Sequence, residues 1–269
     1  MENSNLKRRY GRRDLLKAAV AAGAGMSLAP AFGMVRTSGD QASKAAAVSG
    51  RRVLGSGRAA LEVSALGFGV MGMTYNRGPH PDKSRCIRLL REAADRGVTL
   101  FDTAIVYGPL NNEELAGEAL GELRGKVCVT TKFGHEIAGG RATGGQDSRP
   151  ATIRRYCEDS LRRLRVEAIP IFYQHRFDRN TPPEEVAGTL RDLIKEGKVL
   201  HWGMCEVGSD TIRRAHAVCP LTAVQSEYHL MHRDVEKNGV LETCRELGIG
   251  FVPYSPITVS YTHLTLPTT

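Results

Sequence analysis

VTLFDTAIVYG, residues 98–108, is the stretch that decides the fold. It begins as a short apolar run after Gly97, without the alternation of a half-exposed strand. Segments of helical periodicity lie on both sides, which indicates a buried parallel strand. The run ends in Asp102, and Tyr107 follows five residues later. Because the C-terminal ends of parallel strands form the rim where α/β proteins bind ligands, we expect this carboxylate and this phenol at a functional site.

The alternation of strand and helix continues along the chain. After a hairpin at 51–67 and a short strand at 66–69, we expect strands at 98–101, 126–131, 169–174, 199–204, 222–225 and 249–253. Helices are expected at 82–96, 112–123, 150–164, 183–196, 209–217 and 235–247, with Thr181 and Ser209 as caps of the fourth and fifth. Seven β units, six of them followed by a helix, predict an α/β protein, a (β/α)8 TIM barrel that lacks its last unit.

Two glycine-rich segments lie near the expected rim. Gly67–Gly72 matches the G-x-G-x-x-G pattern, but prolines and glycines in Met73–Pro81 follow it where a dinucleotide fingerprint opens a helix. This context excludes a Rossmann site and favours a loop that lets a ligand approach the backbone. Phe133–Arg149 is expected to be a long binding loop.

The N-terminus has the composition of an export signal. Arg12-Arg13-Asp14-Leu15-Leu16-Lys17 matches the twin-arginine pattern, and an Ala/Gly-rich run and Ala29-Pro30-Ala31 follow. We therefore expect a signal peptide at 1–31, read by the twin-arginine export machinery, and a linker at 32–50. The protein would be periplasmic or otherwise extracytoplasmic; a disordered basic tail on a cytoplasmic protein is the alternative. The apolar run is too short for a stable membrane span.

Charge and cysteine content exclude several classes of protein. Of the formal net charge of +8, residues 1–31 supply +4, and no basic stripe interleaved with aromatics indicates a nucleic-acid partner. None of the six cysteines has zinc spacing, and Cys86, Cys128 and Cys157 lie in apolar settings typical of buried thiols. His229-x-x-His232 lacks a third ligand, so we expect no metal site.

The C-terminal stretch does not fit the barrel pattern. Residues 259–269, VSYTHLTLPTT, are Thr-rich and uncharged, and they show no helical period where a helix should follow the seventh strand. They resemble the translation of a sequencing-library adapter. We therefore expect the barrel domain to occupy 51–257 and to continue in the natural protein, with 258–269 a non-native tail; a short disordered C-terminus is the alternative.

Four ionisable side chains lie at or just beyond expected strand ends: Asp102, Tyr107, Lys132 and His175. An ammonium close to a phenol favours the phenolate, and a carboxylate beside that ammonium keeps it charged. A histidine across the rim can donate a hydrogen bond to a carbonyl oxygen. Together the groups make an acid that can protonate a carbonyl as hydride reaches its carbon. Singly, the lysine would be read as an ion-pair partner and the histidine as structural.

At these residues the sequence resembles the aldo-keto reductase family, specifically its bacterial members with twin-arginine signals. The resemblance covers about 54–256, and its motifs are LGFGVMGM, RGVTLFDTAIVYGPLNNEELAGEAL, TKFG, SRP, YQHR, EGKV with HWG, AVQSEY and FVPYSP. It implies Asp102, Tyr107, Lys132 and His175 as a catalytic tetrad with Tyr107 as proton donor. It also implies NADPH (NADP+) bound in an extended form without a Rossmann fold.

The resemblance also implies which residues contact the cofactor. The nicotinamide amide would contact Cys205, Glu206 and Gln225, with Cys205 standing where the family usually has Ser and donating a weaker hydrogen bond. Further expected contacts are Asp102, Met71, the ring of Tyr254 against the nicotinamide, and Ser255 at the start of the pyrophosphate loop. The 2′-phosphate segment is expected beyond Pro256, so the preference for NADPH over NADH is open.

Two functions follow as hypotheses. The first is an NADPH-dependent oxidoreductase that reduces a small-molecule aldehyde or ketone to an alcohol. The second is a cofactor-binding regulatory subunit with slow turnover; an inactive fragment is a third possibility. Because NADPH is not regenerated outside the cytoplasm, an exported reductase would need prebound cofactor or another redox partner.

Overall fold

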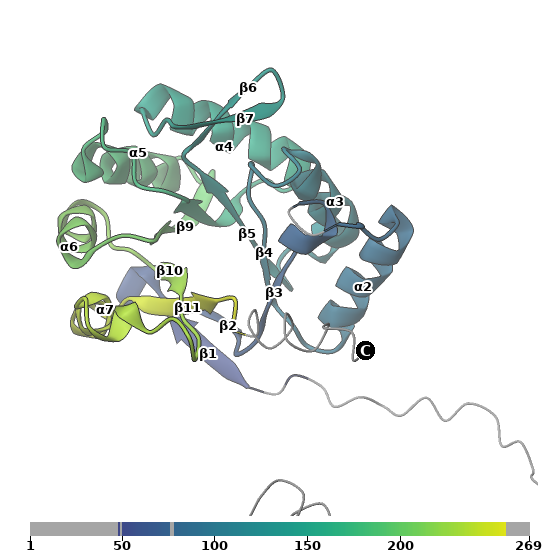
Figure 1. Ribbon diagram of the computed structural model, residues 1–269, viewed down its shortest axis with the longest axis horizontal. Coiled ribbons are helices and arrows are strands. Elements are labelled where there is room, and N and C mark those ends of the chain that lie inside the picture. Colours follow the sequence, from purple (N-terminus) through teal and green to yellow (C-terminus); the bar gives the residue numbers. More distant parts are fainter. Residues whose placement is uncertain (1–47, 49, 76–77, 257–269) are drawn as a thin grey trace, which may run out of the picture. The chain divides into compact units, whose positions relative to one another are not determined.

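The computed structural model describes residues 48, 50–75 and 78–256 (Figure 1). The signal peptide expected at 1–31, nearly all of the expected linker and the tail expected at 258–269 lie outside these residues. Within the described part, no helix is both long and apolar enough to cross a membrane. The described residues belong to the unit that begins at residue 46.

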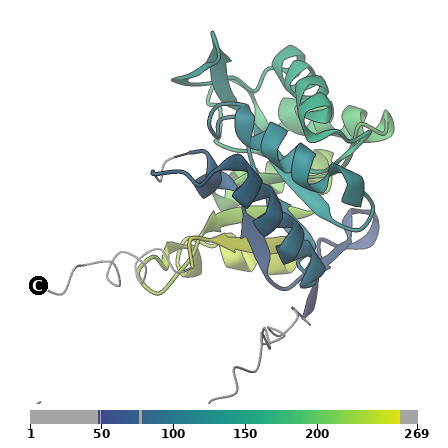
Figure 2. The same cartoon turned by 90° about the vertical axis from the view of Figure 1, so that its right-hand side faces the viewer.

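A seven-stranded parallel sheet organises this unit, in the order β11-β10-β9-β8-β5-β4-β3. The strands are β3 (Gly67–Gly69), β4 (Leu100–Asp102), β5 (Cys128–Phe133), β8 (Ile169–Gln174), β9 (Val199–Cys205), β10 (Ala223–Glu227) and β11 (Gly250–Tyr254). Strands consecutive in the barrel pattern are neighbours, as right-handed βα connections require. The predicted fold class is confirmed: these are strands of a (β/α)8 barrel, curved around a common interior (Figure 2).

Six helices cover the outer face of the sheet (Figure 1). They are α2 (Lys83–Asp95), α3 (Asn111–Leu120), α4 (Pro150–Leu164), α5 (Pro183–Lys195), α6 (Ser209–Val218) and α7 (Val240–Leu247). Local sequence explains several boundaries. Asp82 caps α2 by accepting the backbone N–H of Arg85 at 2.8 Å, Pro150 begins α4, and Gly248 ends α7 in the left-handed conformation.

The strands bury different residues on their two faces. In β8, Phe172 packs outward with Trp202 and Val224 in the core beneath the helices. Its neighbours Ile171 and Tyr173 belong to a second cluster inside the barrel. Because both faces are buried, the strands are near-continuous apolar runs, which is why their positions could be predicted.

An antiparallel hairpin of β1 (Arg51–Leu54) and β2 (Leu61–Ser64) contributes to the interior cluster. Leu54 and Val63 pack there with Leu100 and Ile171. The Thr222 hydroxyl, just before β10, donates to the Ala59 carbonyl in the connection of this hairpin at 2.8 Å. The expected N-terminal hairpin is therefore confirmed.

Three expectations were wrong. The segment 133–149 is not a structureless loop: β6 (His135–Ala138) and β7 (Arg141–Gln146) form an antiparallel hairpin with a register shift. Its tip, Gly139-Gly140, has positive φ at both residues, as tight hairpin turns require, so the glycines mark a turn. Thr181 and Ser209 cap no helix. Thr181 donates to Asp178 at 2.9 Å, and Ser209 to the Asn238 carbonyl at 3.3 Å.

The six cysteines are free and buried, as expected for Cys86, Cys128 and Cys157. They are distributed over α2, β5, α4, β9, α7 and the end of α6. Burial raises the pKa of the Cys128 thiol to about 12 and that of Cys205 to about 12. These thiols are therefore un-ionised at neutral pH.

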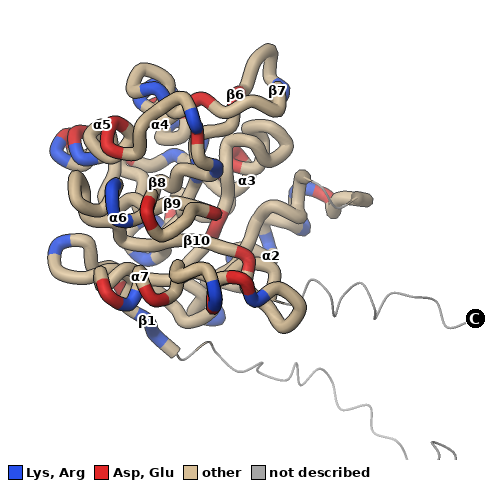
Figure 3. The backbone as a smooth tube through the Cα atoms, turned by 60° about the vertical axis from the view of Figure 1, so that its left-hand side comes forward, with Lys and Arg blue, Asp and Glu red and all other residues tan. Residues whose placement is uncertain are grey.

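Charged residues of both signs mix on the outer helices (Figure 3). Arg214 of α6 pairs with Glu184 of α5 at 2.7 Å, and Arg213 of α6 pairs with Glu246 of α7 at 2.6 Å. Such exposed pairs contribute little individually, about 0–1 kcal/mol.

Candidate active site

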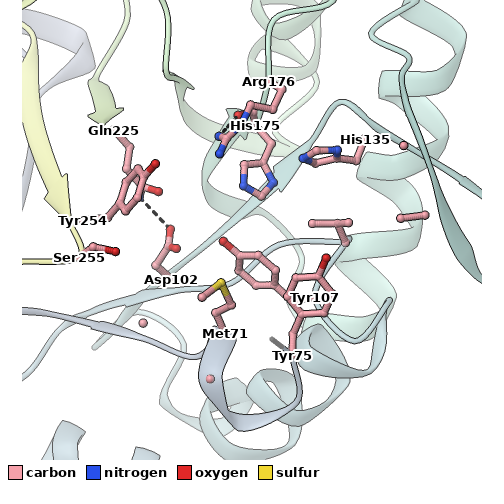
Figure 4. A pocket seen from close by; sticks show the side chains of 15 residues that line it. Met71, Tyr75, Asp102, Tyr107, His135, His175, Arg176, Gln225, Tyr254 and Ser255 are labelled. Carbon is pink, nitrogen blue, oxygen red and sulfur yellow. Dashed lines mark hydrogen bonds between the residues drawn. The ribbon is translucent and has the colours of Figure 1, made fainter. Parts of the chain in front are cut away.

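The C-terminal ends of β4, β5 and β8 bring the four predicted residues to one end of the sheet. Asp102 is the last residue of β4, Lys132 lies next to the end of β5, and His175 follows β8 directly. Tyr107 is in the connection between β4 and α3. A pocket of about 590 Å³ opens there, and Asp102, Tyr107 and His175 line it (Figure 4).

Lys132, which is buried behind the pocket wall, forms an ion pair with Asp102, which lines the pocket. The Lys132 side chain is fully buried, and its ammonium donates to the Asp102 carboxylate and, at 2.8 Å, to the Thr103 carbonyl. Burial is the largest single effect on Lys132 and would lower its pKa. The charge of Asp102 and its hydrogen bond, together with Tyr107 and Cys205, outweigh burial, so the net pKa is raised. Asp102 also accepts from Thr130 at 2.7 Å and from Gln225 at 3.1 Å. The ammonium is therefore charged and held in one place.

Tyr107 lies between this ammonium and the imidazole of His175. The Lys132 nitrogen is 5.2 Å from the centre of the Tyr107 ring, and the His175 ring meets Tyr107 edge-on at 5.6 Å between centres. Burial raises the pKa of the phenol, while Lys132 acts in the opposite direction. The effect of the lysine has the expected sign, but desolvation is larger, so the phenol keeps its proton.

His175 is neutral in this environment. Burial, followed by the nearby Lys132 charge, lowers its pKa far below the usual value. Its buried Nδ1 has no hydrogen-bond partner among the described residues. The second histidine of the pocket, His135 at the start of β6, meets the His175 ring edge-on at 4.8 Å. A neutral imidazole can donate one hydrogen bond, which suits orientation of a carbonyl oxygen.

Asn112 in the first turn of α3 fixes the connection that carries Tyr107, and the sequence analysis did not identify it. Its amide nitrogen donates to the Val70 carbonyl at 3.0 Å and to the Thr74 hydroxyl at 2.7 Å. Its amide oxygen accepts from Thr103 at 2.5 Å. In the sequence, Asn112 is marked only as a polar residue within the family motif RGVTLFDTAIVYGPLNNEELAGEAL.

Five of the seven residues expected to contact the cofactor line the pocket: Met71, Asp102, Gln225, Tyr254 and Ser255. Cys205 and Glu206 do not. Cys205 is buried in the interior cluster, with its sulfur 4.0 Å from the Gln225 amide oxygen. The Glu206 carboxylate accepts the backbone N–H of Glu227 at 2.7 Å. As the last residue of β9, Cys205 points into the packed barrel interior, which explains its position.

The pocket has further walls, and part of them comes from residues 133–149, the segment that was expected to bind a ligand. Ala142 and Gly144 of β7 line one side, and Tyr75 stacks on Tyr107 at 5.6 Å. His135 and Arg176 complete the polar part of the wall. Arg176 directly follows His175 in the YQHR motif, so its position in the chain could have indicated that it lies in the pocket wall.

A barrel with this set of side chains at its rim belongs to the class of (β/α)8-barrel oxidoreductases. The chain is a member of the aldo/keto reductase family, whose model matches residues 65–261. A curated relative, probable aldo-keto reductase 1 of Glycine max, is 46% identical over 202 residues. The match covers 75% of this chain, which spans 58% of the length of that relative.

Solved structures agree with the family assignment. A glycerol dehydrogenase from Gluconobacter oxydans matches with a TM-score of 0.71 and 31% identity, over 81% of this chain and 66% of its own. The holo form of an aldo-keto reductase from Bacillus halodurans matches with a TM-score of 0.71 and 26% identity, over 81% and 70% of the two chains.

Proposed function

We propose that this chain carries the catalytic core of an NADPH-dependent reductase that converts aldehydes or ketones to alcohols. The observation that carries the proposal is the arrangement around Tyr107. A protonated phenol lies between a buried, charged ammonium and a neutral imidazole, beside a pocket large enough for a small ligand. Family membership supports the same class of reaction.

In the proposed mechanism, Tyr107 donates the proton that the carbonyl oxygen needs. The neutral His175 imidazole holds that oxygen by a hydrogen bond. The cofactor, held by the residues described in the next paragraph, would supply the hydride for the carbonyl carbon. The Lys132 ammonium stabilises the phenolate that remains on Tyr107, and Asp102 keeps the ammonium charged and oriented.

The pocket residues fit the nicotinamide end of the cofactor. Gln225 donates to Asp102. Among the described residues, the one hydrogen-bond partner of its amide oxygen is the weak Cys205 thiol at 4.0 Å, so this oxygen can accept from a carboxamide. Tyr254 offers an aromatic face in the same pocket, and Met71 and Ser255 lie beside it. We assign the cofactor site to these residues together with Asp102, which lines the same pocket. Cys205 and Glu206 do not line it and contact Gln225 and the Glu227 backbone instead.

The direct test measures oxidation of NADPH and NADH at 340 nm with benzaldehyde as a neutral substrate. We expect aldehyde-dependent oxidation that is faster with NADPH. Fluorescence titration of NADPH in parallel separates the alternatives, because a regulatory subunit would bind the cofactor with almost no turnover. Binding without aldehyde-dependent oxidation would refute the reductase and favour that alternative.

The pH dependence of this reaction follows from the two pKa shifts. A general acid works while protonated, so the activity is present below the pKa of Tyr107 and is lost as pH rises through it. Because burial raises this pKa above its usual value of about 10, we expect a rate that is flat from about pH 6 to 9 and falls above. His175 is already neutral there and adds no acidic limb. Measured kcat/KM with a half-maximum near neutrality would contradict the assignment.

We further propose that residues 1–31 direct export through the twin-arginine machinery, with the cofactor bound before transport. Replacing Arg12 and Arg13 together with Lys is expected to retain most of the chain in the cytoplasm, because the signal depends on the guanidinium pair. Fractionation of cells followed by immunoblotting measures this. The matched control replaces Arg8 and Arg9 with Lys, so that both variants keep the original net charge. Equal export of both variants would contradict the proposal.

A further inference from the structure

Arg176 places a guanidinium group in the wall of the pocket. Two lining residues carry a full charge at neutral pH, Asp102 and Arg176. The Asp102 charge is compensated by Lys132 directly behind it. The histidines that line the pocket are neutral, since burial lowers both pKa values. Arg176 is therefore the charged lining residue that has no ion-pair partner in the part of the chain that the structure describes.

Most of the hydrogen-bonding capacity of Arg176 is unused among the described residues. The side chain makes one hydrogen bond, from Nη1 to the backbone carbonyl of His175 at 2.7 Å. No carboxylate of the described part lies within ion-pair distance of it. A guanidinium has five N–H donors in a rigid planar fork that matches a carboxylate in a bidentate manner. Donors are thus left for a ligand.

The position of Arg176 is next to the reacting groups. It follows His175 in the chain. Burial raises the pKa of the Cys205 thiol and of the Tyr254 phenol, and Glu206 adds to the rise at Tyr254; the charge of Arg176 acts on both groups in the opposite direction, so it lies near them. Figure 4 shows its side chain on the side of His175 opposite to His135. A group bound to Arg176 would therefore lie close to a carbonyl held by Tyr107 and His175.

The rest of the wall is mostly uncharged. Met71, Val106, Tyr75 and Ala142 supply apolar and aromatic surface. Arg176 is half-buried, so water screens its charge less than that of a surface arginine. This combination suits a small molecule with an apolar or aromatic body and one anionic group.

We propose that Arg176 is a specificity-determining residue that binds a carboxylate of the substrate, so that the site prefers carbonyl compounds bearing a carboxylate over neutral ones. The proposal rests on the proposed function and names its substrate class.

The test compares 4-carboxybenzaldehyde with its neutral methyl ester, methyl 4-formylbenzoate, as substrates of this chain. In Arg176→Gln we expect the ratio of kcat/KM for the acid to that for the ester to fall roughly 10- to 100-fold, the usual effect of losing a charge-assisted pair. The fall in this ratio should come from a lower kcat/KM for the acid, whereas kcat/KM for the ester should change much less. Arg176→Lys should retain part of the preference, because it keeps the charge and loses the fork. The control is Arg191→Gln, an exposed arginine of α5 outside the pocket.

A second measurement does not depend on turnover. Calorimetric titration with benzoate should show binding that weakens at least about tenfold in Arg176→Gln, while the binding of benzamide stays the same. An equal loss for acid and ester, or equal benzoate binding by both proteins, would overturn the proposal. Loss of NADPH binding in Arg176→Gln would overturn it too, by assigning the arginine to a cofactor phosphate. If no aldehyde is reduced but benzoate binding depends on Arg176, the reductase fails while the anion site stands.

Discussion

Tyr107→Phe is expected to lower kcat for aldehyde reduction by about 10²- to 10⁴-fold, the range typical for removal of a general acid. The phenol is the one group near the pocket that is protonated at neutral pH, desolvated and next to both Lys132 and His175. The substitution removes a single oxygen. The ring should keep its stacking on Tyr75 and its edge contact with His175, so the fold and the pocket are retained.

The measurement is single-turnover oxidation of bound NADPH, with cofactor affinity determined separately by fluorescence. We expect an unchanged Kd for NADPH and a collapse of the chemical step. Tyr228→Phe serves as the matched control, because its hydroxyl binds Glu236 and the residue does not line the pocket. A Tyr107→Phe protein that turns over at the original rate would assign the proton donor elsewhere.

Arg163→Leu is expected to destabilise the fold by about 3–5 kcal/mol, the usual cost of leaving a buried charge without its partner. Arg163 of α4 donates to the Glu113 carboxylate of α3 at 2.6 Å, and the Glu113 side chain is 0% exposed. The second Glu113 oxygen accepts from Thr131 of β5 at 2.6 Å. The pair thus joins two helices to the strand that carries Lys132.

Urea-induced unfolding followed by far-UV circular dichroism measures the change, with a large drop in midpoint expected. Arg162→Leu is the control from the same helix turn. Its partner Asp159 and the arginine itself are far more exposed, so the change should stay within about 0.5 kcal/mol. Replacing Glu113 and Arg163 together with Leu should recover most of the loss. Equal midpoints for the Arg162 and Arg163 variants would show that the buried pair is not stabilising.

The barrel strands were predictable because each is a buried apolar run. Ile169–Gln174 and Pro150–Leu164 have the expected boundaries, and the others differ at their ends. Residues at strand ends could be assigned to one rim, since parallel strands end on the same side. That rule alone was enough to predict that Asp102, Lys132 and His175 come together.

The rest depended on tertiary context. The hairpin at 135–146 was missed because its glycines and polar residues also fit a loop, and its pairing depends on the packing of Ile137 against the core. The net pKa of Tyr107 depends on burial, which a sequence does not state. The roles of Asn112 and Arg176 depend on the folded structure. Asn112 forms a hydrogen bond with Val70, which lies 42 residues away in the sequence. Arg176 lies in the YQHR motif, but its place in the pocket wall follows from the residues around it.

The six buried thiols can report local unfolding of this chain. Only a thiolate reacts readily with oxidants or alkylating agents, and all six cysteines are buried in the folded state. They are spread over α2, α4, α7, β5, β9 and the end of α6. Oxidation or alkylation of one of these thiols therefore indicates that the element that carries it has opened. The set of modified cysteines thus reports which parts of the chain have unfolded locally.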